Sequence, residues 1–129
     1  MVIENKEFIA FVPFYARWPY EVHIYPLSHQ ENISQLGEEQ IKYLAMILKE
    51  LINRYNSLFN FKMPYVMVIH QTPTDKKDHG YYHLHFEFYP PYRTSNKLKF
   101  LAGCELGAGT FINDTLPEEK AEELRKIKV

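Results

Sequence analysis

His83-Leu84-His85-Phe86-Glu87-Phe88 alternates polar and apolar side chains without interruption. Successive side chains of an extended strand point to opposite faces of a sheet, so the two histidines and the glutamate share one face. The leucine and the two phenylalanines share the other face, which is suited to packing against a core. Residues 81–89 (YYHLHFEFY) therefore predict a strand, and the two prolines that follow end it.

The residues before this strand predict a hairpin. Residues 64–71 (PYVMVIHQ) are rich in β-branched and apolar side chains, which predicts a strand in the centre of a sheet. Residues 72–80 (TPTDKKDHG) are polar and rich in turn formers, as expected for the connecting loop. Pairing of the two strands across this loop would bring His70 close to His85 or Glu87.

Two further strands are predicted near the N-terminus, over residues 7–14 (EFIAFVPF) and 20–25 (YEVHIY). In the second of them the apolar residues alternate with Glu21, His23 and Tyr25, which share the opposite face. We interpret His23 and His79 as ordinary exposed or capping residues, and His29 as a surface residue, with a role in anchoring its loop as the alternative.

Helical periodicity accounts for most of the rest of the chain. Apolar side chains recur every three or four positions over residues 38–58, which predicts an amphipathic helix with Gly37 as its N-cap. Residues 117–127 predict a second helix that begins at a proline. Residues 97–110 have no clear period. The order of elements predicts one α+β domain over residues 1–129, with the helices packed on an antiparallel sheet.

Charge and cysteine content exclude several classes of protein. The chain has 15 Lys and Arg residues against 16 Asp and Glu residues, a net charge of −1, so no basic excess favours nucleic acids or anionic membranes. No run of about 18 apolar residues could form a transmembrane helix. The single cysteine, Cys104, excludes a disulfide framework and fits a cytoplasmic protein. We interpret it as a small, half-buried residue rather than a nucleophile.

The polar face of the hairpin is the candidate site. Two or three imidazoles with a carboxylate suit a divalent zinc or iron ion, and His70, His85 and Glu87 are the candidate ligands. His83 lies on the same predicted face. The alternative is a solvated polar face on a half-exposed sheet, in which these side chains have no ligand.

Ordered blocks of sequence carry a family resemblance: Phe11-Val12-Pro13, Ala16-Arg17-Trp18-Pro19-Tyr20-Glu21, Pro26-x-x-His29, Arg54-Tyr55-Asn56-x-Leu58-Phe59, Pro64-Tyr65, His70-x-x-Pro73, Leu84-His85-x-x-Phe88-Tyr89-Pro90-Pro91, Lys99-Phe100-x-x-Gly103-x-Glu105 and Pro117-Glu118. With these blocks the chain resembles, over nearly its whole length, the C-terminal half of galactose-1-phosphate uridylyltransferases of the histidine-triad superfamily. The resemblance implies a histidine-triad-like antiparallel sheet with a long packed helix and a C-terminal helix.

The resemblance also implies a reaction, the exchange of uridylyl between UDP-glucose and galactose 1-phosphate by double displacement. The family nucleophile is a histidine of a His-Pro-His motif in the N-terminal half. This chain contains no His-Pro dipeptide, so on its own it lacks that nucleophile. A cytoplasmic homodimer, and a separate N-terminal half as a partner, follow as expectations.

Particular residues match the family's sites. His70 and His85 match two histidine ligands of one structural zinc or iron ion, and Glu87 stands where a third histidine is common. The family's remaining ligand, a carboxylate, belongs to the N-terminal half, which leaves a position that water or His83 could fill. Lys99, Phe100 and Glu105 match a segment that contacts the hexose 1-phosphate, with the lysine on phosphate and the glutamate on sugar hydroxyls. Cys104 stands where tyrosine is common.

Two other functions are open at this point. One is a stand-alone histidine-triad-like nucleotide hydrolase or transferase, with His85 as its nucleophile and Glu87 as a hydrogen-bond partner. The other is a non-catalytic, metal-stabilised module that binds a sugar phosphate. Turnover that His85→Ala abolishes would favour the first, and chelator-sensitive folding without turnover would favour the second.

Overall fold

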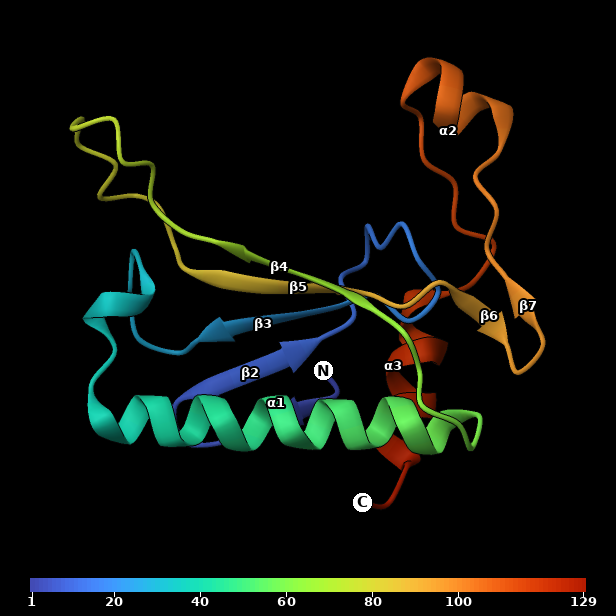
Figure 1. Ribbon diagram of the computed structural model, residues 1–129, viewed down its shortest axis with the longest axis horizontal. Coiled ribbons are helices and arrows are strands. Elements are labelled where there is room, and N and C mark those ends of the chain that lie inside the picture. Colours follow the sequence, from blue (N-terminus) through green and yellow to red (C-terminus); the bar gives the residue numbers. More distant parts are fainter.

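The computed structural model describes residues 1–129 and contains a five-stranded antiparallel sheet with helices packed against it (Figure 1). The elements in chain order are β1 (Ile3–Glu4), β2 (Phe8–Phe11), β3 (Val22–Pro26), η1 (Ile33–Gln35), α1 (Glu38–Leu58), β4 (Val66–His70), β5 (His85–Tyr89), β6 (Tyr92–Thr94), β7 (Lys97–Leu98), α2 (Gly103–Ala108) and α3 (Pro117–Lys126). The sheet order is β1-β2-β3-β5-β4, and β6 pairs with β7 in a separate ribbon. The predicted α+β class with an antiparallel sheet is confirmed.

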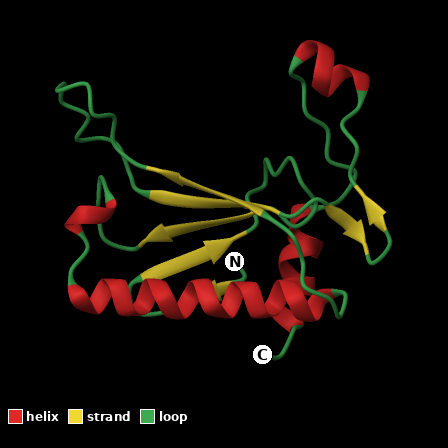
Figure 2. Cartoon of the chain, in the orientation of Figure 1, coloured by secondary structure: helices red, strands yellow, loops and turns green.

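The long helix α1 runs along the sheet, whereas the β4–β5 loop and α2 project away from it (Figure 2). The start of α1 agrees with the prediction: Gly37 is the N-cap, and Gln40 Oε1 accepts a hydrogen bond from the Gly37 amide at 3.1 Å. Glu38 and Glu39 in the first turn suit the positive end of the helix dipole. The predicted C-terminal helix is also confirmed, as α3.

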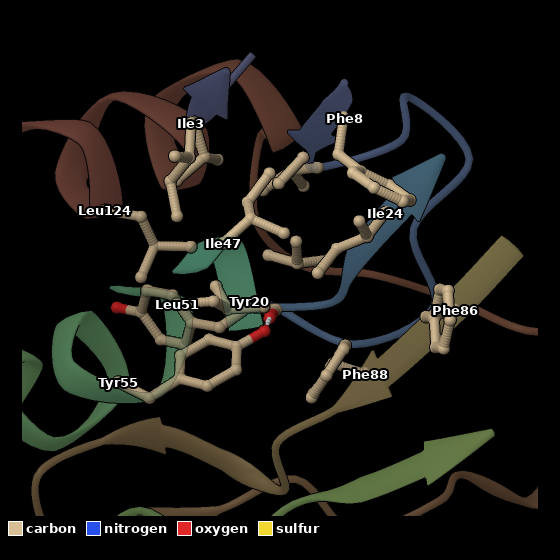
Figure 3. Close-up of a cluster of buried hydrophobic side chains, with 14 of the residues drawn as sticks. Ile3, Phe8, Tyr20, Ile24, Ile47, Leu51, Tyr55, Phe86, Phe88 and Leu124 are labelled. Atoms are coloured by element: carbon tan, nitrogen blue, oxygen red, sulfur yellow. Dashed lines mark hydrogen bonds between the residues drawn. The ribbon is translucent and has the colours of Figure 1, made fainter. Parts of the chain in front are cut away.

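The core lies between α1, α3 and one face of the sheet. Alternate residues of the strands enter it, and Figure 3 shows Phe88 of β5 near Tyr55 of α1. The Tyr55 hydroxyl donates a hydrogen bond to the Tyr20 carbonyl at 2.8 Å (Figure 3), so this buried hydroxyl has a partner inside the core. Burial of this face leaves the other face of the sheet to the polar residues of the same strands.

The termini of the helices are joined by one guanidinium. Nη1 of Arg54, near the end of α1, donates to the carbonyls of Leu124, Arg125 and Ile127 at 2.7, 2.9 and 2.7 Å. Those carbonyls belong to the last turn of α3 and the residue after it, where a helix lacks its regular backbone donors; only the Leu124 carbonyl has another one, the Ile127 amide at 3.3 Å. Arg54 therefore caps α3 from a position 70 residues earlier in the chain.

The prediction that residues 64–71 form a central strand is wrong. The strand is β4, at the edge of the sheet, and Val66, Met67 and Ile69 are 60%, 43% and 40% exposed. An apolar run indicates burial on both faces, but both faces of β4 are partly exposed: Val66 shares the face of Tyr89, whereas Met67 and Ile69 share the face of Phe88 and Phe86.

The strand expected over residues 81–89 begins only at His85. The Leu84 amide donates to the Gln30 carbonyl at 2.7 Å, so it forms no hydrogen bond with β4, and the pairing of β4 with β5 begins at His85. The undecided residues 97–110 contain β7 and α2. Cys104 is exposed in α2, contrary to the half-buried position expected. No helix of the structure has the length and apolar character needed to cross a membrane.

Candidate metal centre

The polar face of the sheet brings together His70, His85 and Glu87, as predicted from the hairpin. His70 and His85 are cross-strand partners on β4 and β5, and Glu87 follows two residues later on β5. His70 Nε2 lies 3.4 Å from Glu87 Oε2, and His85 Nε2 lies 3.3 Å from Glu87 Oε1. One potential ligand atom from each residue lies within 4.8 Å of the other two.

The orientation of His85 is fixed by its neighbours. Its Nδ1 donates a hydrogen bond to the His83 carbonyl at 2.9 Å, which leaves Nε2 with a lone pair directed at the cluster. The His70 and Tyr25 rings, on the two strands that flank β5, stack on it with centroids 4.7 and 4.8 Å away. Glu87 is fixed in turn, because the Tyr89 hydroxyl donates a hydrogen bond to its Oε2.

The donor set fits a divalent zinc or iron ion. Zinc binds imidazole nitrogen and carboxylate oxygen at about 2.0–2.2 Å, so tetrahedral ligands are separated by about 3.3–3.6 Å. His70 lies 3.4 Å from Oε2 of Glu87 and His85 lies 3.3 Å from Oε1, so each imidazole is at this spacing from one of the two carboxylate oxygens. Nitrogen and oxygen donors of intermediate hardness also suit ferrous iron.

A fourth group, His23, was missed in the sequence. It is only 2% exposed, and the prediction that it is an exposed or capping residue is therefore wrong. His23 is the cross-strand partner of Glu87, and its Nδ1 lies 3.8 Å from Glu87 Oε1. Its Nε2 donates to Glu21 Oε1 at 2.8 Å. The alternation of residues 20–25 placed Glu21 and His23 on one face, but the pairing of β3 with β5 was not predictable from the sequence.

Glu21 is buried as well, at 3% exposed. Its Oε2 accepts hydrogen bonds from the Arg17 and Trp18 amides at 2.7 and 3.2 Å. Backbone amides of the turn before β3 therefore fix the position of the Glu21 carboxylate, and this carboxylate fixes the His23 ring through its hydrogen bond to Nε2.

The other histidines do not join the cluster. His83 precedes β5, and its Nε2 bonds to the Pro26 carbonyl at 3.0 Å. His29 is exposed and packs edge-on against His83. His79 bonds to Asp75 at 2.8 Å in the β4–β5 loop, and this hydrogen bond lowers the pKa of Asp75. His83 therefore does not supply the extra ligand that the resemblance left open.

Lys99 and Glu105 form a buried ion pair away from the cluster. Lys99 Nζ donates to Glu105 Oε2 at 3.0 Å, to the Ile112 carbonyl at 2.6 Å and to the Arg17 carbonyl. Glu105 Oε1 accepts from the Ala102 amide at 2.9 Å. The Ala102 hydrogen bond, with those from Lys99 and Ile112, lowers the pKa of Glu105.

In this conformation all three N–H groups of the Lys99 ammonium donate hydrogen bonds within the protein. The ion pair thereby connects α2 to the turn before β3. Phe100, between these two residues, is 83% exposed. Direct contact of Lys99, Phe100 and Glu105 with a hexose phosphate stays a prediction.

An apolar pocket of about 560 Å³ opens beside this pair. Its walls include Trp18 from the turn, Tyr65 and Val66 from the start of β4, and Phe111 from the loop after α2. The Arg17 guanidinium lies 4.5 Å from the centre of the Phe111 ring. The pocket is continuous with the exposed edge strand, because Val66 belongs to both.

Comparison with solved structures defines the class of fold. A Hit-like protein from Bartonella henselae superposes with a TM-score of 0.63 at 17% identity, over 96% of this chain and 82% of that protein. At that identity the likeness concerns the fold alone. The chain has a histidine-triad-like fold, as the resemblance of its sequence implied.

Matches of higher identity give the family. The family described as the galactose-1-phosphate uridyl transferase C-terminal domain matches residues 1–129. A galactose-1-phosphate uridylyltransferase of Thermotoga maritima is 43% identical over 99% of this chain and 41% of that protein. A solved uridylyltransferase superposes with a TM-score of 0.88 at 47% identity, over 96% of this chain and 39% of that one. The chain belongs to the family of galactose-1-phosphate uridylyltransferase C-terminal domains, and it spans about two fifths of the length of these relatives.

Proposed function

We propose that this chain supplies the C-terminal half of an enzyme that transfers uridylyl between UDP-glucose and a hexose 1-phosphate. In this role it holds one structural zinc or iron ion with His70, His85 and Glu87 and contributes Lys99, Phe100 and Glu105 to the hexose-1-phosphate pocket. The observation that carries the proposal is the convergence of two imidazoles and a carboxylate on the sheet of a chain that matches the family throughout.

The chain's own residues argue against catalysis by this half alone. It has no His-Pro dipeptide, so the histidine motif of the family nucleophile is missing. His85 is a poor substitute, because its Nδ1 bonds to the His83 carbonyl and its Nε2 lies 3.3 Å from Glu87. The lone pair of Nε2 is thus directed at Glu87, which suits a metal ligand, whereas a nucleophile needs that lone pair directed at a substrate phosphorus.

The partner in this proposal is an N-terminal half, which the resemblance assigns to the part of the family relatives that these 129 residues do not match. Val66 is exposed on the pocket side of the sheet, and Met67 and Ile69 are exposed on the opposite side, so both sides of the β4 edge are open to such a partner. An uncovered edge strand also offers unpaired backbone groups to another strand. Covering this surface would explain why the apolar sequence of β4 has the character of a central strand.

A homodimer in the cytoplasm completes the proposal. The resemblance implies that the hexose-1-phosphate pocket is completed across a dimer. The single exposed thiol, Cys104, suits a reducing compartment. Light scattering on the chain with its N-terminal half present measures the assembly.

The experiment is a turnover assay on the isolated, metal-analysed chain. UDP-glucose is supplied alone and with galactose 1-phosphate. We expect no turnover from this chain, and turnover after addition of an N-terminal half taken from the Thermotoga maritima relative. Turnover by the chain alone, abolished by His85→Ala, would overturn the half-enzyme proposal and favour the stand-alone hydrolase or transferase.

A further inference from the structure

We infer that Nδ1 of His23 is an additional protein ligand of the metal ion held by His70, His85 and Glu87. This inference rests on the proposed function, because it takes the ion at that cluster as given. It adds a third imidazole, from β3, to a site otherwise built on β4 and β5. The result is a ligand set of three histidines and one glutamate, all from this chain.

The first observation is an unpartnered polar atom. His23 is 2% exposed, and its Nδ1 is the one buried side-chain nitrogen or oxygen of the chain that has no hydrogen-bond partner. Leaving such an atom without a partner costs free energy, so an unpaired group deep in a sheet calls for an explanation. Bonding to a cation would satisfy it.

The second observation is the protonation of the ring. Two backbone amides occupy Glu21 Oε2, and Glu21 Oε1 accepts from His23 Nε2 at 2.8 Å. The proton of a neutral imidazole is thereby placed on Nε2, and Nδ1 carries the lone pair. A carboxylate that holds the far nitrogen of an imidazole is the usual surrounding of a metal-bound histidine.

The third observation is the position of that lone pair. Nδ1 lies 3.8 Å from Glu87 Oε1, which itself lies 3.3 Å from His85 Nε2. A lone pair opposite a carboxylate oxygen is repulsive, and a cation bonded to both atoms at about 2.0–2.2 Å reverses the sign of that interaction. A cavity of about 80 Å³ is lined by His23, Glu21 and Glu87 among others, but not by His70 or His85.

The additional ligand changes the kind of site. Structural zinc sites are closed by four protein ligands, whereas catalytic sites keep one position for water or substrate. With His23 bound, the ion has no position left for substrate, which agrees with a structural role. The site is then complete without a carboxylate from the N-terminal half.

The experiment titrates the metal-free chain with Co²⁺, whose visible absorption distinguishes tetrahedral from six-coordinate binding. The variants are His23→Gln, the matched control His29→Gln, an exposed histidine, and His70→Ala. We expect a tetrahedral spectrum for the unmodified chain and for His29→Gln. We expect His23→Gln to bind Co²⁺ at least tenfold more weakly, with a spectrum shifted toward higher coordination as water enters.

Each other outcome is decisive. An unchanged spectrum in His23→Gln, with or without a loss of affinity, would overturn the assignment and leave His23 at most a positioning residue for Glu87. If His70→Ala also leaves Co²⁺ binding unchanged, the metal site of the proposed function fails instead.

A measurement on the unmodified chain covers the case in which His23→Gln does not fold. With an NMR-active cadmium isotope in the site, scalar coupling to imidazole nitrogen reports each bound ring. We expect coupling to Nδ1 of His23 as well as to His70 and His85. Coupling to the latter two alone would overturn the inference.

Discussion

His70 on β4 and His85 on β5 face each other across the hairpin, with ring centroids 4.7 Å apart and planes inclined by 15°. Tyr25 stacks on His85 from the other neighbouring strand at 4.8 Å with an inclination of 2°. The central imidazole therefore has little freedom to rotate. A site whose rings are already oriented loses less entropy when it binds an ion.

Metal binding should stabilise the fold measurably. At a free zinc concentration 100 times its Kd, we expect the free energy of unfolding to rise by about 2.7 kcal/mol. For a domain of this size the rise corresponds to roughly 10 °C in Tm. Calorimetry with and without zinc measures the shift, which His70→Ala and His85→Ala should abolish and His29→Gln should retain. An equal Tm with and without zinc in the unmodified chain would contradict the site.

The buried Lys99–Glu105 pair should matter more than surface pairs. Its side chains are 6% and 1% exposed, so Lys99→Met leaves a carboxylate buried without its cation. We expect a clear fall in Tm by thermal unfolding, whereas Lys6→Met, which breaks a pair exposed at 58% and 60%, should leave the Tm nearly unchanged. Equal effects of the two substitutions would show that the buried pair has no special role.

The same pair predicts a dependence of stability on pH. The pKa of Glu105 is lowered from 4.5 by hydrogen bonds from Ala102, Lys99 and Ile112. Its contribution to stability is therefore complete above about pH 4.5 and is lost as the pH falls toward the folded pKa. Urea unfolding between about pH 3 and about pH 7 should show a loss of stability in acid, and this loss should be smaller in Glu105→Gln.

The buried Tyr55 hydroxyl should contribute through its hydrogen bond to Tyr20. Tyr55→Phe leaves the Tyr20 carbonyl without this donor, and we expect a loss of about 1–2 kcal/mol in the free energy of unfolding. Tyr81→Phe, at a residue that is 80% exposed, is the matched control and should have little effect. Equal denaturation midpoints for the two variants would argue against a structural role of the bond.

The face of β4 that carries Met67 and Ile69 should contact the proposed N-terminal half. Ile69→Lys places a charge on a side chain that is 40% exposed, so the isolated chain should change in stability by no more than about 0.5 kcal/mol. Binding of the N-terminal half, measured by calorimetric titration, should weaken at least tenfold. Ile41→Lys, on a residue of α1 that is 53% exposed, should leave binding unchanged. Undiminished binding by Ile69→Lys would place the contact elsewhere.

Local pattern was sufficient to predict part of this structure. The alternation around His85 and Glu87, the hairpin that returns His70 to them, and the periodicity of α1 depend on neighbours in the sequence. His23 could not be predicted in the same way, because its burial follows from the pairing of β3 with β5 across some 60 intervening residues. The position of β4 was mistaken for a related reason, since apolar side chains have the same pattern whether their own chain or another chain covers them.

His70 lies on the last strand of the sheet, whereas Glu87 and His23 lie nearer its middle. An ion bound by all of them joins three strands across their hydrogen-bond ladder and holds the edge strand to the rest of the sheet. That edge is also where the proposed other half binds. Loss of the ion would therefore loosen the edge strand, so chelation should weaken binding of the proposed other half as well as lower the stability of this domain.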